Sequence, residues 1–138
     1  MPPLDTSIVP GSVYYFHDAR LSSTQSHYFV VLNKNPLTDS VLLLVCSTSR
    51  VDSARSRRHL RRETLVEVSP AEYSEFTVQS MFDCNTVFDL SLSELQRKYD
   101  AGRLRVKLNI GASILEKLRD AVIESDLVEE EIKDILIL

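Results

Sequence analysis

The sequence predicts a mainly β domain of the α+β class, a small antiparallel barrel or sandwich with a helical layer at its C-terminal end. Roughly five or six short runs rich in β-branched, aromatic and aliphatic residues fill the first 110 positions, and capping signals for longer helices follow position 90. Strands this short must close on themselves or be covered to protect their edges. We expect one domain over 1–138, with a barrel and inserted helices over about 11–110 and a C-terminal helical layer over 111–138.

The first three strands are predicted by composition and turn signals. Residues 12–16, SVYYF, follow the turn signal Pro10-Gly11 and indicate the first strand. Residues 28–33 and 41–48 are almost continuously apolar, which is typical of central strands, and the polar turn between them predicts a hairpin.

A long basic loop is predicted over residues 49–62. Its apolar residues follow no period, and six arginines against one aspartate give it a charge of +5. These arginines are Arg50, Arg55, Arg57, Arg58, Arg61 and Arg62.

The middle of the chain predicts further strands and one short turn of helix. Residues 64–68 alternate as a half-exposed strand, and residues 76–90 supply one or two more. Between them, Ser69 and Glu72 have the spacing of a capping box with Pro70 at the first helical position, which predicts a short helical turn.

The last third of the chain predicts three helices and one strand. Ser91 and Glu94 again have capping-box spacing and Gly102 is a typical C-terminal residue, which together predict a helix near 92–101. Residues 103–110 alternate apolar and mostly basic side chains, as a strand with one wet, basic face would.

Ser113 and Glu116 are predicted to open the next helix, and residues 126–138 form the last one, with acidic residues in its first turn. Residues 116–134 carry three cations and eight acids, a charge of −5, so this acidic tail would attract the basic loop within a chain or between chains. The apolar terminus over 135–138 is expected to pack on the barrel or on a second subunit.

Composition excludes several classes of protein. The chain of 138 residues has 16 basic and 20 acidic side chains, so its net charge of −4 argues against general polyanion binding and requires a local patch for any phosphate. Cys46 and Cys84 lie in apolar runs without metal-ligand spacing and predict buried thiols, with one disulfide between them as the alternative. No Gly-rich phosphate loop, CxxC, HExxH or GxSxG motif occurs, so we expect no cofactor and no metal.

The location is predicted from the same composition. The apolar runs are too short to span a bilayer, and the N-terminus has no basic cluster before an apolar core. We therefore expect a soluble cytoplasmic protein with no membrane partner.

Several residues occur in the order of a known family. Gly11 precedes VYYF, a polar loop leads to HYFVVLN, and the next strand ends in VCSTSR. In this order the chain resembles the PemK/MazF family of bacterial toxins, in which a glycine precedes the first strand, an Arg-Pro pair precedes a VVL strand, and a Ser or Thr pair ends the next strand. Here His27-Tyr28 stand at the Arg-Pro positions and Ser47-Thr48 at the last pair. The DCN segment over 83–85 and the turn at Gly102 resemble the second half of the family more loosely.

The resemblance implies a fold and a function. It implies a small SH3-like antiparallel barrel with C-terminal helices, a homodimer, and a growth-inhibiting toxin that acts as a metal-independent endoribonuclease on single-stranded RNA. Its protein partner would be an antitoxin.

Metal-free cleavage of RNA needs a base for the 2′-hydroxyl proton, groups that stabilise charge on phosphorus, and an acid for the leaving oxygen. His27 could be base or acid, Ser47 and Thr48 could bind a phosphate oxygen, and Arg50 could clamp the phosphate. The remaining RNA-binding candidates are Arg55, Arg57, Arg58, Arg61, Arg62 and Asn85. The simpler alternatives are a loop-end histidine, hydroxyls that cap a turn, a solvated loop, and a turn residue at Asn85.

Two other functions remain open at this point. The same barrel could be a non-catalytic binding module for a protein or a nucleic acid. It could also inhibit a topoisomerase through its C-terminal helix, as the similar CcdB toxins do.

Overall fold

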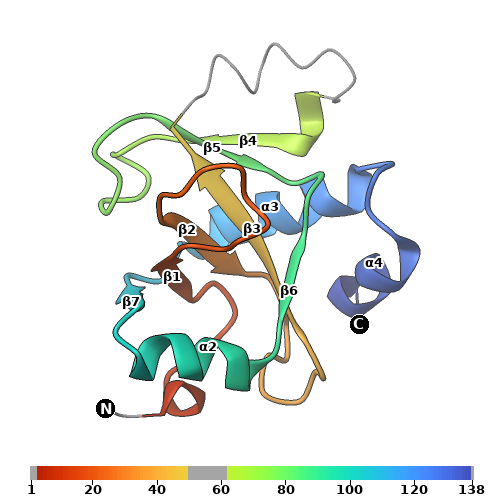
Figure 1. The fold of residues 1–138 in the computed structure, drawn as a ribbon. Helices are drawn as coiled ribbons and strands as arrows, with labels where there is room; N and C mark the ends of the chain where they lie inside the picture. Colours follow the sequence, from red (N-terminus) through yellow and green to blue (C-terminus); the bar gives the residue numbers. More distant parts are fainter. Residues whose placement is uncertain (1–2, 50–61, 138) are drawn as a thin grey trace.

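The structure is a computed structural model that describes residues 3–49 and 62–137. The candidate residues Arg50, Arg55, Arg57, Arg58 and Arg61 lie outside the described residues. The elements, in chain order, are η1 (Leu4–Thr6), β1 (Val13–Phe16), β2 (His27–Val31), β3 (Leu42–Thr48), η2 (Arg62–Thr64), β4 (Leu65–Val68), β5 (Ser80–Asp83), β6 (Phe88–Leu90), α2 (Leu92–Asp100), β7 (Leu104–Lys107), α3 (Ala112–Glu124) and α4 (Glu130–Ile137) (Figure 1).

The predicted mainly β fold with C-terminal helices is confirmed, but the sheet does not close. Its strand order is β4-β5-β3-β2-β1-β7, with β6 also paired to β3, and every pairing is antiparallel. No pairing within the described part of the chain joins β4 to β7, so the structure shows an open sheet where a barrel was expected. Helices cover the sheet instead, which removes the need for closure.

The sheet forks at strand β3, because two different strands pair with the same side of it. On one side β3 pairs with β2. On its other side, Leu42 to Leu44 pair with β6, whereas Ser47 and Thr48 pair with β5. The two partner strands therefore diverge around Cys46, and this divergence positions the cleft described below.

The central strands are buried on both faces, because alternate side chains enter two separate cores. One core holds Val13, Val30, Leu43 and Val45 together with Leu118 of α3 and Leu136 of α4. The other holds Tyr14, Phe16, Phe29 and Leu44 together with Leu95 of α2 and Leu4 of η1. Burial on both faces explains why these strands are almost continuously apolar in sequence.

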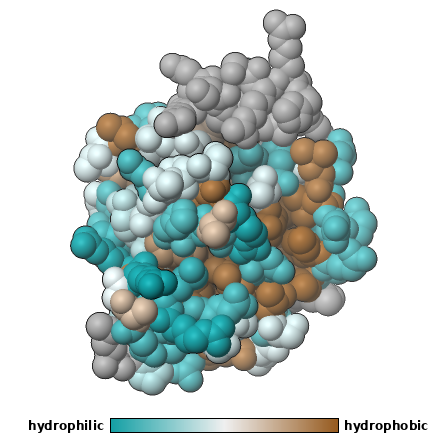
Figure 2. Space-filling model, in the orientation of Figure 1, coloured by the Kyte–Doolittle hydropathy of each residue, from teal (hydrophilic) through white to brown (hydrophobic). Residues whose placement is uncertain are grey.

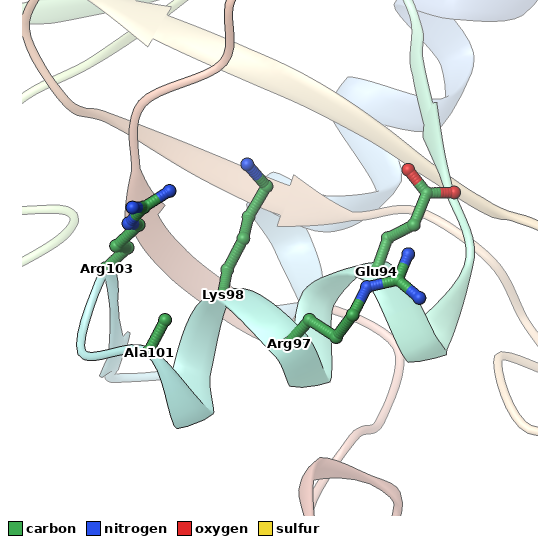
Figure 3. A pocket seen from close by; sticks show the side chains of 5 residues that line it. All are labelled: Glu94, Arg97, Lys98, Ala101 and Arg103. Carbon is green, nitrogen blue, oxygen red and sulfur yellow. The ribbon is translucent and has the colours of Figure 1, made fainter.

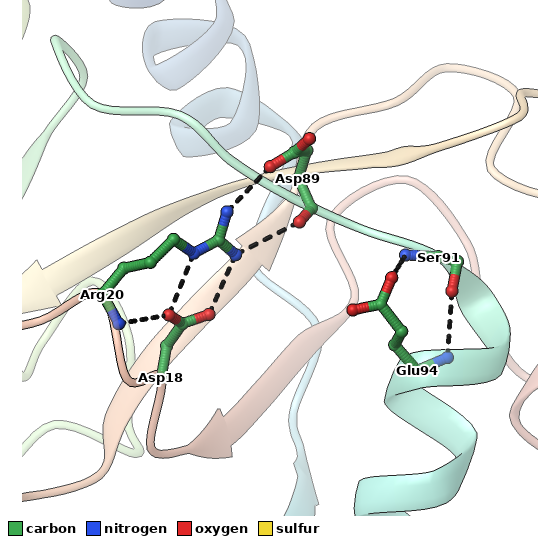
Figure 4. A network of polar contacts seen from close by, with 5 residues as sticks. All are labelled: Asp18, Arg20, Asp89, Ser91 and Glu94. Carbon is green, nitrogen blue, oxygen red and sulfur yellow. Dashed lines mark hydrogen bonds and ion pairs between the residues drawn. The ribbon is translucent and has the colours of Figure 1, made fainter.

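Both capping boxes predicted ahead of residue 100 are confirmed. The Ser91 hydroxyl accepts from the Glu94 N–H and the Glu94 carboxylate accepts from the Ser91 N–H, both at 3.1 Å (Figure 4). The same reciprocal bonds join Ser69 and Glu72 at the start of a single turn. Gly102 follows α2 with a φ of 74°, a left-handed conformation that glycine adopts without strain.

Two sequence predictions need correction. Helix α3 begins at Ala112 with Gly111 as its N-cap and no side-chain cap, so Ser113 lies inside the helix and does not open it. Strand β7 ends at Lys107, and Val106 and Leu108 are 49% and 58% exposed instead of buried. The reason is that β7 is an edge strand, paired with β1 alone, so its alternation is not matched by a covered face.

Both ends of the chain pack on the sheet. Of the apolar terminus over 135–138, which was expected to pack on the barrel or on a second subunit, Leu136 is 1% exposed in the core beneath α3. Ile137 is 56% exposed, and residue 138 lies outside the described residues. At the other end, Leu4 and Ile8 are buried, and the Leu4 N–H donates to Gln96 Oε1 on α2 at 2.6 Å.

Side chains bind the backbone just beyond β7. The Tyr73 hydroxyl donates to the Leu108 carbonyl at 2.7 Å, and the Leu108 N–H donates to Glu75 Oε2 at 3.1 Å. This part of the sheet edge is therefore already hydrogen-bonded. Among the described helices, none is long and apolar enough to cross a membrane.

Candidate functional site

A cleft of about 900 Å³ lies where β5 and β6 diverge from β3. Its walls come from the start of β2, the end of β3, the loop that precedes β2, the segment before β5, and the β5–β6 connection. Nine of its 21 lining residues are serine or threonine and four are aromatic, so the cleft offers hydroxyl groups and ring faces more than charge. Surfaces of this composition suit a ligand with both polar groups and flat rings.

His27 is the first residue of β2 and lines the cleft. Its Nδ1 lies 3.0 Å from the Ser47 carbonyl oxygen, which can only accept, so Nδ1 carries the proton. In the neutral ring Nε2 is then the basic nitrogen, and it is buried without a hydrogen-bond partner among the described residues. The imidazole must therefore turn outward before Nε2 can take a proton from a ligand.

Ser47 and Thr48 end β3 and line the same cleft. They pair with Phe82 and Met81 of β5, which holds the end of β3 against the fork. Three of the four predicted catalytic residues thus share one cleft, although they come from segments 20 residues apart. The fourth, Arg50, follows two residues after Thr48 and lies outside the described residues.

Arg20 lines the cleft and was not singled out by sequence reasoning. It donates to both oxygens of Asp18 at 2.9–3.0 Å, and to the side chain and carbonyl of Asp89 at 2.7 and 3.1 Å (Figure 4). Its guanidinium also lies over the Phe88 ring, 5.1 Å from the centroid. Four of its five N–H donors are therefore engaged, so Arg20 ties the loop before β2 to β6 and builds the wall of the cleft. The spacing Asp-x-Arg is the only signal of this link in sequence.

The Asp18 carboxyl is buried and strongly coupled to this arginine. Hydrogen bonds from Arg20 hold the pKa of Asp18 below its ordinary value of 3.8, against the opposing effect of burial. The same bonds raise the pKa of Arg20. The pair is therefore fully ionised at neutral pH.

Aromatic side chains line one part of the cleft. Tyr15 and Tyr28 are half-buried with ring centroids 4.8 Å apart, and Tyr28 meets Phe76 edge-on at 5.1 Å. Of the five aromatic residues in β1 and β2, these two tyrosines alone line the cleft, and the other three are core residues. The Tyr28 hydroxyl donates to the Glu75 carbonyl at 3.3 Å, which fixes the ring.

Two predicted RNA-binding residues do not line the cleft. Asn85 Nδ2 donates to Thr64 Oγ1 at 2.8 Å, and its Oδ1 accepts from the Ser125 hydroxyl at 2.6 Å, so its side chain joins η2 to the end of α3. Arg62 lies exposed in η2 and is also absent from the cleft lining. The simpler reading of Asn85, as a residue that holds a turn, matches these bonds.

The cysteines are buried or half-buried free thiols, so the alternative of a disulfide is excluded. Burial raises the pKa of Cys46 to about 12 and also raises that of Cys84. Both thiols are protonated at neutral pH and are poor nucleophiles, even though Cys46 lines the cleft.

The described lining of the cleft is slightly acidic. Arg20 is its one described arginine or lysine, against Glu75 and Asp83. A polyanion in this cleft therefore needs cations from elsewhere on the chain. In the part of the chain that the structure describes, no group of three or more His, Cys, Asp or Glu side chains could hold a metal ion.

Comparison with known proteins does not identify a family. No protein-family model matches the chain, and no curated protein matches it either.

Proposed function

We propose that the chain is a metal-independent endoribonuclease of the PemK/MazF-like toxin kind, with the cleft at the β3 fork as its site for single-stranded RNA. The observation that supports this most directly is that His27, Ser47 and Thr48 line one cleft, with His27 Nδ1 3.0 Å from the Ser47 carbonyl. A histidine, hydroxyl groups and exposed ring faces in one cleft match what RNA cleavage and RNA binding require.

In this proposal the protein moves one proton and stabilises charge. After the imidazole turns outward, His27 Nε2 takes the 2′-hydroxyl proton and the 2′ oxygen bonds to phosphorus. The bond from phosphorus to the 5′ oxygen breaks, and the 5′ oxygen takes a proton from water. The products are a 2′,3′-cyclic phosphate and a 5′-hydroxyl end. Ser47 and Thr48 hydrogen-bond the phosphate, and Arg50, which follows them in sequence, supplies positive charge. Tyr15 and Tyr28 offer their rings to bases.

The first test is incubation of the purified protein with mixed-sequence RNA in EDTA, followed by analysis of fragment ends. We expect fragments with 2′,3′-cyclic phosphate ends, and a rate that falls about 10²- to 10⁴-fold in His27→Ala. His17→Ala is the matched control, because His17 is an exposed histidine in the loop between β1 and β2 that does not line the cleft. Arg50→Ala should also lower the rate. Intact RNA, or equal loss in both histidine variants, contradicts the proposal.

A second candidate is a non-catalytic RNA-binding module that uses the same cleft. It is favoured by one observation: His27 Nε2 is buried, and Nδ1 is held by a backbone carbonyl, as expected of a packing residue. The two candidates differ in a simple measurement. If RNA binds and stays intact, and His27→Ala leaves the affinity unchanged within about twofold, the binding module is the function.

The proposal includes two partners, a second copy of the chain and an acidic antitoxin segment. The +5 charge over residues 49–62 is what an acidic segment would compete for with RNA. A light-scattering mass of twice the monomer, and displacement of bound RNA by an acidic peptide, are the expected results. A monomeric mass at micromolar concentration contradicts the dimer.

A further inference from the structure

A group of basic side chains lies on α2 and β7, in a part of the sequence separate from the arginine-rich residues 49–62. We call it the α2–β7 basic surface, and its members are Arg97, Lys98, Arg103, Arg105 and Lys107. They are five of the eleven lysines and arginines in the described residues and fall within eleven positions of a chain with net charge −4. Hydrophilic side chains gather over α2 in the corresponding region of Figure 2.

None of the five cations makes an ion pair within the described part of the chain. The two acids on α2 are engaged elsewhere: Glu94 accepts from the Ser91 N–H, and Asp100 accepts from Gln96 Nε2 at 2.9 Å. Cations outnumber acids by five to two over residues 94–107, so this stretch is locally basic although the whole chain has a net charge of −4.

The cations border a hollow of about 400 Å³ at the C-terminal half of α2. It is lined by Arg97, Lys98 and Arg103 together with Glu94 and Ala101. In Figure 3 the side chains of Lys98 and Arg103 rise on the same side of α2, from the helix and from the turn that follows it. The Lys98 stem covers the buried Phe16 ring, with Nζ 5.6 Å from the centroid, which limits how far that charge can move.

Only the β7 part of this surface lies beside Tyr15, because Arg105 and Lys107 lie on the Tyr15 face of the sheet, whereas Lys98 lies over Phe16 on the other face. Lys107 Nζ lies 5.6 Å from the centroid of Tyr15, and Tyr15 lines the cleft beside Tyr28. Arg105 pairs with Tyr15 across the β1–β7 ladder. Because alternate residues of a strand share a face, Arg105 and Lys107 lie on one face roughly 7 Å apart.

We infer that Arg105 and Lys107, the β7 part of the α2–β7 basic surface, bind the phosphate backbone of the same RNA strand where that strand leaves the cleft past Tyr15. This inference rests on the proposed function. We choose RNA over an acidic peptide because Lys107 lies beside the ring of Tyr15, which lines the cleft, and a cation next to a ring face suits a phosphate and its base. Phosphates need only the cations and an adjacent ring face.

The test measures how RNA affinity depends on salt. The probe is a fluorescent 20-nucleotide 2′-O-methyl RNA of mixed sequence, which cannot be cleaved because it has no 2′-hydroxyl. Its dissociation constant is measured by anisotropy between 50 and 300 mM KCl for the wild type and for Arg105→Gln/Lys107→Gln. The control is Lys34→Gln/Lys117→Gln, which changes the net charge equally at two exposed lysines outside the surface.

We expect the Arg105→Gln/Lys107→Gln variant to bind at least fivefold more weakly at the lowest salt. The slope of log affinity against log salt should fall by about 1.4, since each contact with single-stranded nucleic acid contributes about 0.7. The control should keep the wild-type slope. Equal effects in both double variants, or none in either, overturn the inference and leave the proposed function standing. If the wild type does not bind the RNA, both the inference and the proposed function are overturned. If it binds polyglutamate tightly and does not bind RNA, the surface is assigned to an acidic protein partner instead.

Discussion

At the scale of single residues, the polar side chains that stabilise the walls of the cleft differ from those proposed to contact RNA in it. The Arg20 side chain makes four hydrogen bonds to Asp18 and Asp89, so its charge is used within the fold. His27 has one ring nitrogen bound to a carbonyl and one without a partner in the described residues. Substitutions of Arg20 should therefore change the shape of the cleft, whereas substitutions of His27 should remove the proposed base and leave the cleft wall in place.

The Asp18–Arg20 pair predicts a specific dependence of stability on pH. Since the pKa of Asp18 is lowered in the folded protein, the unfolded chain binds more protons between the folded value and 3.8. The stabilisation is complete above pH 3.8 and is lost as pH falls through the folded pKa. Asp18→Asn should cost about 2 kcal/mol at pH 7 and less at pH 2, measured by urea unfolding.

Asp89→Asn is the control for that measurement. Asp89 also binds Arg20, but its side chain is 64% exposed, so its loss should cost no more than about 0.5 kcal/mol. If the two substitutions lowered the free energy of unfolding equally, the burial of Asp18 would not be the source of the stability that the Asp18–Arg20 pair contributes.

Some site residues could be predicted from the sequence and others could not. His27, Ser47 and Thr48 were singled out because they stand at motif positions of the family that the chain resembles, at the start of one apolar run and the end of another. Arg20 was not, because its partner Asp89 is 69 residues away and no local pattern connects them. Asn85 was misleading for the same reason, since its partners Thr64 and Ser125 are far apart in the chain.

At the scale of elements, local signals predicted α2 well and the edges of the sheet poorly. The Ser91–Glu94 box and Gly102 are contiguous in sequence and both act as predicted. The start of α3 was misplaced because Gly111 supplies the extended N-cap conformation without any side-chain signal. The exposed face of β7 was missed because alternation cannot show which strand lies at an edge.

Helix α4 offers a test of what its apolar end contributes. Leu136 is 1% exposed and Ile137 is 56% exposed, although they are neighbours in sequence. Leu136→Ala should lower the free energy of unfolding by about 2–4 kcal/mol, whereas Ile137→Ala should change it by less than about 0.5 kcal/mol. Urea titration followed by circular dichroism measures both, and similar values would contradict the burial of α4 against the sheet.

At the scale of the whole molecule, one sheet is shared by two cores. The same three strands supply side chains to the core beneath α3 and α4 and to the core beneath α2 and η1. Because β1, β2 and β3 cannot leave one core without leaving the other, the two cores should unfold together.

Two adjacent residues of β3 test this coupling. Val45 enters one core and Leu44 the other, and both are completely buried. Val45→Ala and Leu44→Ala should each lower the midpoint of a single thermal transition, by several degrees. Calorimetry that resolves two transitions, each shifted by one variant only, would show that the cores are independent.

The hydrogen bonds on Leu108 also bear on how the protein behaves when it is concentrated. A free sheet edge can recruit the same edge of another copy and grow into fibres. Here Tyr73 and Glu75 occupy the backbone next to β7, and Arg105 and Lys107 would place like charges together if two copies met along that strand. Beyond the end of β7, side chains thus protect the open sheet against self-polymerisation, a protection that a closed barrel would obtain from its geometry.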